Sequence, residues 1–326
     1  PVPPLNERNR FQLLALSFKL SLFHYNITMQ SESFWNFYWE TRLQYLQGQG
    51  KSQVILQASR LIRDASPPAR ILEAGCGEAQ IIGALVDAHG SPSGEQASVG
   101  MDRDTKALAV ARQQHPTIRF LEGDFTDHQL LRSLGKFDLL LLVNALHHVF
   151  SDAYDPELGE INVPQGKENV RSAFADLAQT IKPGGHLILF DGLEAPGSPD
   201  TLIRIRFQTN DAWHKFQTFV LEYEPFKIQY ETLQNQVVQL SLRDFTRYVT
   251  KIIFLEKPLW ERERHESYQY FQESEMRDML VDNGFEIQDF RLISVDYDHW
   301  LQEVEILTPH LQFPPEHVII TAQKLR

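Results

Sequence analysis

The sequence predicts a doubly wound α/β fold with a mostly parallel, seven-stranded sheet. From residue 70 onward short apolar runs alternate with longer helix-like segments, a pattern typical of βαβ units, and two further apolar runs close the chain. The expected strands are residues 70–74, 97–102, 118–121, 137–143, 185–191, 285–294 and 316–323. The expected helices are residues 78–89, 105–114, 127–134, 168–181 and 273–284, the last ending at the helix stop Asn283-Gly284.

The distribution of these apolar and helix-like segments divides the chain into four parts. They are an N-terminal helical extension at 1–68, an α/β core at 69–192, an insertion at 193–270 and the C-terminal part of the core at 271–326. Pro67 and Pro68 mark the first boundary, because proline interrupts a helix.

The insertion is rich in aromatic residues at loosely helical spacing, for example Trp213, Phe216 and Phe219. We therefore expect a mostly helical cap over the C-terminal edge of the sheet. Most of these aromatic side chains pack inside the cap on this interpretation, and the others line a substrate pocket. The N-terminal Trp35 and Tyr38 are candidates to close the same pocket.

Composition restricts the partners of the chain. The formal net charge is -12 and no dense run of Lys or Arg occurs, so a nucleic-acid substrate is disfavoured. No apolar stretch is long enough for a membrane-spanning helix, and no membrane partner is expected. The single cysteine, Cys76, cannot form an internal disulfide, which fits a cytoplasmic location. Oligomeric state is not readable.

The most informative motif is ILEAGCGEA at residues 71–79, in which a strand runs into Gly75 and Gly77 before a helix. Glycine permits a tight turn and a close approach of backbone N–H groups to a ligand. The next two strands end in Asp102 and Asp124, whose carboxylates could accept hydrogen bonds from a ribose and an adenine amino group. Alone, the glycine turn also fits a plain strand-to-helix connection.

The ensemble of motifs resembles the class I S-adenosylmethionine (SAM)-dependent methyltransferases, a family with a Rossmann-like sheet. The resemblance covers residues 70–191 and rests on ILEAGCG, VGMD, EGDF, FDLLLLVNALHHV and LAQTIKPGGHLILFDG. It implies SAM as cofactor. It also implies that Glu73, Gly75 and Gly77 hold the methionine end, Asp102 the ribose, Asp124 and Phe125 the adenine, and that Asn144 faces the cofactor. The family's third glycine is Ala79 here.

His147 and His148 follow the fourth expected strand. Paired histidines act as a base, as metal ligands or in packing. The resemblance places His147 at the methyl-transfer site, where it could remove the proton of a hydroxyl acceptor. We therefore take His147 rather than His148 as the candidate catalytic residue, and expect no metal site.

The predicted function is SAM-dependent methylation of a small molecule, with O-methylation first and N- or C-methylation as alternatives. A dehydrogenase that binds NAD would also fit Gly75 and Asp102, but not the Asp124 strand end or the Lys182–Gly185 turn. A non-catalytic member of the fold that binds SAM stays open as well.

Overall fold

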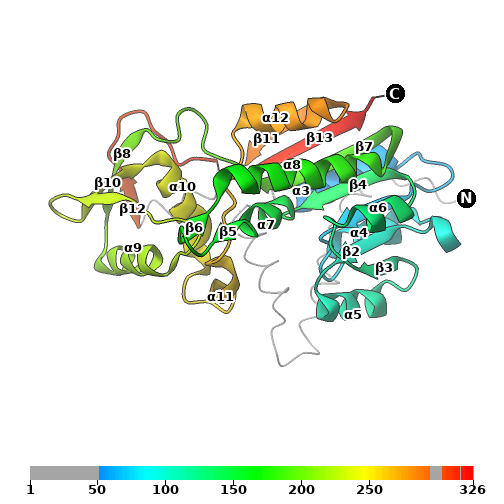
Figure 1. Cartoon of the computed structure of the whole chain (residues 1–326), viewed down its shortest axis with the longest axis horizontal. Coiled ribbons are helices and arrows are strands. Elements are labelled where there is room, and N and C mark those ends of the chain that lie inside the picture. Colours follow the sequence, from blue (N-terminus) through cyan, green and yellow to red (C-terminus); the bar gives the residue numbers. More distant parts are fainter. Residues whose placement is uncertain (1–50, 294–302, 316, 326) are drawn as a thin grey trace, which may run out of the picture.

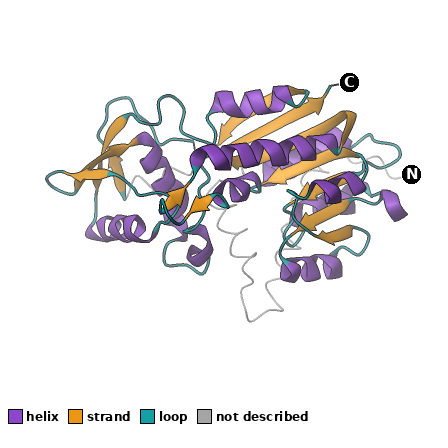
Figure 2. Ribbon diagram, viewed as in Figure 1, coloured by secondary structure: helices purple, strands orange, loops and turns teal. Residues whose placement is uncertain are grey.

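The computed structural model describes residues 51–293, 303–315 and 317–325. Its centre is a seven-stranded sheet in the order β11-β13-β7-β4-β1-β2-β3 (Figures 1 and 2). The strands are β1 (Ile71–Ala74), β2 (Val99–Asp102), β3 (Arg119–Glu122), β4 (Phe137–Val143), β7 (Ile181–Gly192), β11 (Phe285–Ile293) and β13 (His317–Lys324). Only β13 runs opposite to the other six strands of this sheet, so the predicted fold class and terminal strand pair are confirmed.

Helices cover both faces of this sheet. Side chains of α3 (Lys51–Ile62), α4 (Gln80–His89) and α5 (Thr105–Gln114) pack into one apolar cluster with one face of the strands. Side chains of α6 (His128–Ser133), α7 (Leu146–Ser151), α8 (Val163–Gln179) and α12 (Glu273–Asp282) pack into the second cluster. A short 3-10 helix, η1 (Gly94–Gln96), precedes β2.

The central strand β4 explains why the sequence forms this three-layer arrangement. Leu139 and Leu141 pack into one cluster, whereas Leu140 and Leu142 pack into the other, and all four are fully buried. Burial of each such side chain contributes about 1.5–3 kcal/mol relative to exposure. A strand covered on both faces therefore has an unbroken apolar sequence instead of an alternating one.

Two element boundaries differ from the sequence prediction by more than two residues. The helix α8 begins at Val163, before the predicted start, because Asn162 caps it and Pro164 in its first turn loses no hydrogen bond. The strand β7 begins at Ile181 instead of residue 185. The register beside β4 shifts between Phe137 and Leu139, so the Lys182–Gly185 turn is an irregularity inside the strand.

The insertion at 193–270 contains a sheet as well as helices, so the prediction of a mostly helical cap was incomplete. The order of the second sheet is β12-β8-β10-β9. Its strands are β8 (Leu202–Phe207), β9 (Tyr230–Thr232), β10 (Val237–Ser241) and β12 (Val304–Ile306), and the helical elements are α9 (Asn210–Glu222), α10 (Leu242–Lys251), η2 (Ile252–Phe254) and α11 (Trp260–Glu263). A small hairpin of β5 (Tyr154–Asp155) and β6 (Glu160–Ile161) lies between α7 and α8 in the chain.

The strand β8 shows why the sheet was missed. Its sequence, LIRIRF, alternates between exposed and buried positions, which is the period of a half-covered strand. The aromatic residues nearby dominated the sequence pattern. Phe216, Phe219 and Tyr248 are fully buried and pack into the same apolar cluster as side chains of α7 and α8, in agreement with the packing interpretation.

Most of the predicted N-terminal extension, with Trp35 and Tyr38, lies outside the described residues. The part that is described, α3, contacts α4, β7 and β4. Across the described ranges, no helix combines the length and the apolar character that a membrane span requires.

Candidate active site

The glycine-rich turn joins β1 to α4 and adopts left-handed backbone conformations. Gly75 has φ +81°, Gly77 +53° and Ala79 +64°. The N–H groups of Gly75 and Cys76 donate to the Met101 carbonyl at 2.8 and 3.0 Å, which fixes the turn against β2. A Cβ on Gly75 would lie 3.0 Å from the Cβ of Ala145. Glycine is therefore required at position 75 for two independent reasons, whereas Ala79 tolerates a strained φ.

Two carboxylates at the strand ends hold this turn in place. Glu73 is buried, and its Oε2 accepts a hydrogen bond from the N–H of Ile82 in the first turn of α4 at 2.9 Å. Asp102 accepts from the N–H of Gly77 at 2.7 Å and from that of Asp104 at 2.8 Å, one on each oxygen. Each carboxylate oxygen has a second lone pair, so both groups keep acceptor capacity for a ligand.

The end of β3 presents Asp124 and Phe125 in different ways. Phe125 is buried and lines the cavity. The Asp124 carboxylate accepts hydrogen bonds from the N–H and hydroxyl of Thr126, both at 2.8 Å, and lies 3.4 Å from the guanidinium of Arg103. Arg103 also pairs with Asp152 at 3.1 Å, so it links the ends of β2, β3 and α7.

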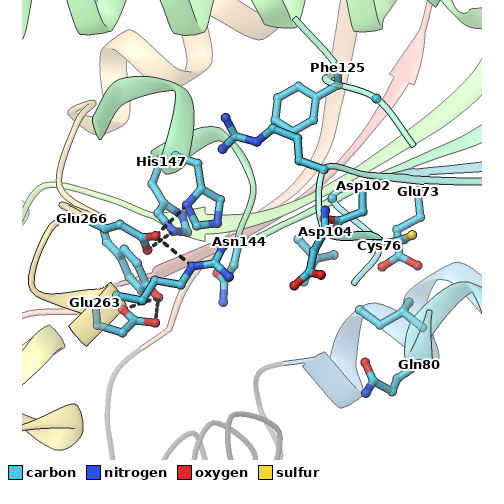
Figure 3. Close-up of a pocket in the computed structure, with 18 residues that line it drawn as sticks. Glu73, Cys76, Gln80, Asp102, Asp104, Phe125, Asn144, His147, Glu263 and Glu266 are labelled. Atoms are coloured by element: carbon cyan, nitrogen blue, oxygen red, sulfur yellow. Dashed lines mark hydrogen bonds and ion pairs between the residues drawn. The ribbon is translucent and has the colours of Figure 1, made fainter. Parts of the chain in front are cut away.

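A cavity of about 270 Å³ connects the glycine turn to the insertion (Figure 3). Six of the eight predicted site residues line it, namely Glu73, Gly75, Asp102, Phe125, Asn144 and His147. Gly77 and Asp124 flank the cavity without lining it. The insertion contributes Arg262, Glu263, Glu266 and Tyr268, and α7 also contributes His148.

His147 is positioned by Asp191, the carboxylate near the end of β7. Asp191 is fully buried, and its Oδ2 accepts hydrogen bonds from the N–H groups of Ala145 and Leu146 at 3.2 and 2.8 Å. Its Oδ1 lies 2.7 Å from Nδ1 of His147. Because the ionised carboxylate only accepts, Nδ1 is the donor, and Nε2 is the ring nitrogen that points away from Asp191. The turn before α7 places Asn144 at φ +50° in the cavity wall.

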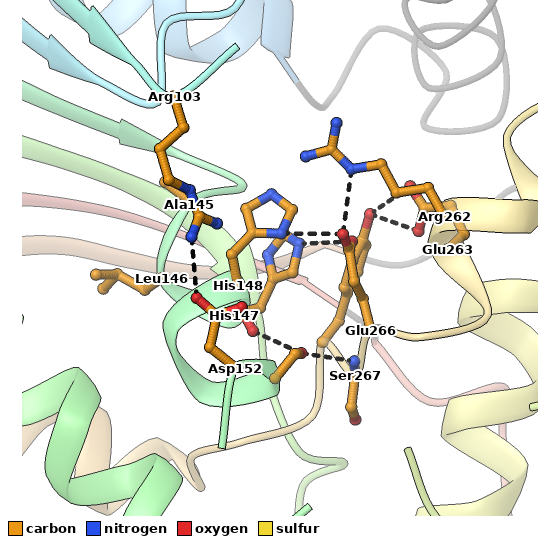
Figure 4. A network of polar contacts seen from close by, with 12 residues as sticks. Arg103, Ala145, Leu146, His147, His148, Asp152, Arg262, Glu263, Glu266 and Ser267 are labelled. Atoms are coloured by element: carbon orange, nitrogen blue, oxygen red, sulfur yellow. Dashed lines mark hydrogen bonds and ion pairs between the residues drawn. The ribbon is translucent and has the colours of Figure 1, made fainter. Parts of the chain in front are cut away.

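Glu266 is the second carboxylate beside His147 (Figure 4). Its Oε2 lies 3.6 Å from Nε2 of His147, and its Oε1 lies 3.1 Å from Nδ1 of His148 and 3.2 Å from Nε of Arg262. The ring of Tyr268 packs on His147 with centroids 4.0 Å apart. Beyond it, Glu263 pairs with the buried Lys251 at 2.6 Å.

In this cluster, burial and neighbouring charges shift the pKa values of the side chains in opposite directions. Burial favours neutral His147, but Asp191 and Glu266 outweigh burial and raise the pKa of the imidazole. Burial would raise the pKa of Asp191, but His147 outweighs it, so the pKa of Asp191 is lowered. The pKa of Glu266 is well below its usual range despite burial, because His148, His147 and Lys251 favour its charged form. Burial dominates at His148 and lowers its pKa.

The sequence analysis missed Asp191 and the residues from the insertion. Asp191 carried a usable signal, since it comes near the end of an apolar strand as Asp102 does. Arg262, Glu263 and Glu266 belong to a charged run, ERERHE, that resembles any solvated helix surface. Only the folding of the insertion against α7 brings that run to the cavity.

The fold and the glycine-turn end of the site define the class of protein. A seven-stranded sheet with a terminal antiparallel pair, a glycine turn after β1 and acidic ends on β2 and β3 is the arrangement of class I SAM-dependent methyltransferases. A family model described as "Methyltransferase domain" matches residues 71–163. Residues 71–163 therefore carry a methyltransferase domain, the domain of an enzyme that transfers methyl groups.

Solved structures with similar folds are distant in sequence. Magnesium protoporphyrin IX methyltransferase from Synechocystis PCC 6803, with bound SAM, is 15% identical over 99% of this chain and 100% of its own, with a TM-score of 0.45. A SAM-dependent methyltransferase from Mesorhizobium loti is 16% identical over 78% and 91%, with a TM-score of 0.44. The N-methyltransferase NodS from Bradyrhizobium japonicum is 11% identical over 84% and 87%, with a TM-score of 0.40. No curated protein matches the sequence.

Proposed function

We propose that the chain transfers the methyl group of SAM to a hydroxyl oxygen of a small-molecule acceptor. The observation that carries this proposal is that one continuous cavity runs from the glycine turn to the His147–Glu266 cluster. One end has the features of a nucleotide-binding crevice, and the other gathers groups that bind and release protons.

The residues at the glycine end fit SAM. Gly75 lets the turn pass close to Ala145, and we propose that the carboxylates of Glu73 and Asp102 accept hydrogen bonds from an amino group and a ribose. Phe125 offers an apolar wall for a flat ring, and we propose that Asp124 supplies the adenine contact. Gly77 holds Asp102 in place, and Asn144 completes the wall. When bound, SAM supplies a methyl group on a positively charged sulfur.

The insertion end favours a polar acceptor. Its lining side chains are His147, His148, Arg262, Glu263, Glu266 and Tyr268. The aromatic side chains of Trp213, Phe216 and Phe219 pack in the apolar cluster and do not line this cavity. A molecule that carries hydroxyl groups matches these donors and acceptors, and the net charge of -12 argues against a nucleic acid.

His147 is the proposed catalytic residue. Asp191 fixes the ring through Nδ1, which directs Nε2 toward Glu266 at the cavity wall. The pair of Nε2 and Oε2 can take up the proton that the acceptor hydroxyl loses as its oxygen accepts the methyl group. Holding the oxygen in line with the methyl group contributes further, because alignment replaces a bimolecular encounter.

The test is a transfer assay with the full chain, SAM carrying an isotopically labelled methyl group, and fractionated small molecules from cells. We expect a product that has gained one labelled methyl group, located on oxygen by NMR. Methyl attached to nitrogen or carbon would overturn the hydroxyl assignment. Tight SAM binding without transfer to any fraction would indicate a non-catalytic protein.

A further inference from the structure

We propose that His147, His148 and Glu266 form a binding site for a divalent first-row transition ion such as Zn²⁺ or Co²⁺. One nitrogen or oxygen from each residue lies within 4.8 Å of those of the other two. His147 and His148 are neighbours at the start of α7, and Glu266 reaches them from the insertion (Figure 4). No metal-ligand spacing is visible in the sequence, because the third ligand is far away in the chain.

The distances suit one shared ion. Nε2 of His147 is 3.6 Å from Oε2 of Glu266, and Nδ1 of His148 is 3.1 Å from Oε1. Zinc binds nitrogen and oxygen ligands at ~2.0–2.2 Å, which places two ligands of a tetrahedral ion about 3.4 Å apart. The His147–Glu266 and His148–Glu266 separations lie close to this value, and all three ligand atoms lie within 4.8 Å, so side-chain adjustments would bring them into one coordination sphere.

Two atoms of the cluster lack a hydrogen-bond partner. Within the described ranges, neither Nε2 of His147 nor Oε2 of Glu266 has one, although both atoms are buried. Buried polar atoms almost always have a partner in folded proteins. The 3.6 Å between these two atoms is too long for a hydrogen bond and suits an ion between them.

Asp191 gives His147 the surroundings of a metal ligand. Ligating histidines donate their second ring N–H to a carboxylate or carbonyl, which fixes the tautomer and turns the free lone pair toward the metal. Oδ1 of Asp191 holds Nδ1 of His147 at 2.7 Å, while Oδ2 is occupied by backbone N–H groups. Nε2 is thus the oriented ligand.

The charges of the cluster allow a divalent cation. Asp191 and Glu266 together supply two negative charges, and the ion replaces any proton on His147. Of the two nearby cations, Lys251 pairs with Glu263 outside the cluster, whereas Arg262 contacts the cluster itself at Oε1 of Glu266. Oε2 of Glu266 is the oxygen that carries no such contact.

Two imidazoles and one carboxylate select the ion. Imidazole suits zinc, cobalt and related ions, whereas Mg²⁺ prefers oxygen ligands. The open side of the ion would face the cavity, where it could bind the acceptor hydroxyl and lower the pKa of that group. With an ion bound, Nε2 and Oε2 would be ligands and could not take up the proton, so the hydroxyl would lose it to water instead. This role rests on the proposed function and changes its proton acceptor, but ion binding itself does not depend on it.

The experiment measures ion binding without SAM or acceptor. The full chain is stripped with a chelator and dialysed. It is then titrated with ZnCl₂ and MgCl₂ by calorimetry, and with CoCl₂ by visible absorption. We expect one equivalent of Zn²⁺, a Co²⁺ spectrum of a nitrogen- and oxygen-ligated ion, and no Mg²⁺ binding. His148→Ala and Glu266→Gln should each weaken Zn²⁺ binding at least about 10-fold.

The matched control is His265→Ala. His265 is a neighbouring, half-exposed histidine that pairs with Glu224 outside the cluster, so its loss should leave Zn²⁺ binding unchanged. His148 is itself partly exposed, which keeps one ligand variant foldable even if Glu266→Gln fails. Equal Zn²⁺ affinity in the wild type and both ligand variants would overturn the site. Methyl transfer by a chain that binds no ion would overturn only the metal site and leave the proposed function standing.

Discussion

The two ends of the cavity are built in different ways. At the glycine end, residues 73–125 supply three strand ends, and each carboxylate is held by backbone N–H groups of an adjacent turn. At the other end, α7, β7 and the insertion meet, and carboxylates and imidazoles hold one another. The first end is therefore a property of local chain geometry, whereas the second depends on how distant segments pack.

This difference has a functional consequence. A carboxylate held by backbone N–H groups keeps its place when a neighbouring side chain changes. Substitutions at the glycine end should therefore each reduce SAM affinity independently of the others. A network of side chains responds as a unit, because each member fixes the position and charge of the next. Substitutions at the two ends should differ in which measured quantity they change.

Gly75→Val should have the largest effect and abolish SAM binding and all turnover. The new side chain would meet Ala145 at 3.0 Å and force valine into a φ of +81°. Calorimetric titration with SAM measures the loss. Gly184→Val is the control, because Gly184 has a φ of +80° with open space around it, outside the cavity. If Gly184→Val loses SAM binding as completely as Gly75→Val, backbone strain alone explains the loss, and the close approach of Gly75 to Ala145 does not.

The sequence predicted the glycine end well because its signals are local. Gly75, Asp102 and Phe125 sit where a strand gives way to a turn, and parallel strands bring such positions to one edge. Glu266 could not be predicted, because nothing in ERERHE indicates which residue the folded insertion turns toward α7. The second sheet was missed for a related reason: β12 completes it from residues 304–306, after the chain has left the insertion.

His147→Ala should lower kcat by about 10²–10⁴ and leave the Kd for SAM within about twofold. The imidazole belongs to the acceptor end and touches none of the proposed SAM-holding carboxylates. Steady-state kinetics and calorimetry separate the two quantities. The control is His128→Ala, which removes a half-exposed histidine that lies outside the cavity. A variant that keeps its kcat, or that loses SAM affinity in parallel, would place His147 outside the transfer step.

Asp102→Ala should weaken SAM binding by ~1.5–3 kcal/mol, or about 10- to 150-fold, because it removes charge-assisted hydrogen bonds to the ribose. The structure also argues for some loss of stability, because Asp102 accepts hydrogen bonds from the N–H groups of Gly77 and Asp104.

The control for the loss of stability in Asp102→Ala is Asp127→Ala. Asp127 accepts from two backbone N–H groups, at 2.9 and 3.0 Å, at the start of α6 and away from the cavity. Thermal unfolding should shift similarly in both variants, while only Asp102→Ala loses SAM affinity. A parallel titration with NAD should show no saturable binding. Normal SAM affinity in folded Asp102→Ala would contradict the proposed ribose contact.

Asp124→Ala should have the smallest effect of the series, a loss of about 2- to 10-fold in SAM affinity. One charge-assisted hydrogen bond from the amino group to this carboxylate contributes about 1.5 kcal/mol at the lower end of its range. The carboxylate does not line the cavity and is engaged by Thr126 and Arg103, so it must turn to meet an adenine. That rearrangement costs little, because an exposed ion pair contributes only ~0–1 kcal/mol.

The control for Asp124 is Asp152→Ala, since Arg103 pairs with both carboxylates and lines the cavity. If the effect of Asp124→Ala came only from releasing Arg103, Asp152→Ala would reproduce it, because Arg103 lies even closer to Asp152. If Asp124 contacts the adenine, only Asp124→Ala weakens SAM, and replacing the adenine amino group in a SAM analogue removes the difference between variant and wild type. Equal affinities in all three proteins would leave Phe125 as the adenine contact at this strand end. The backbone-held end of the cavity would then recognise the adenine by shape alone.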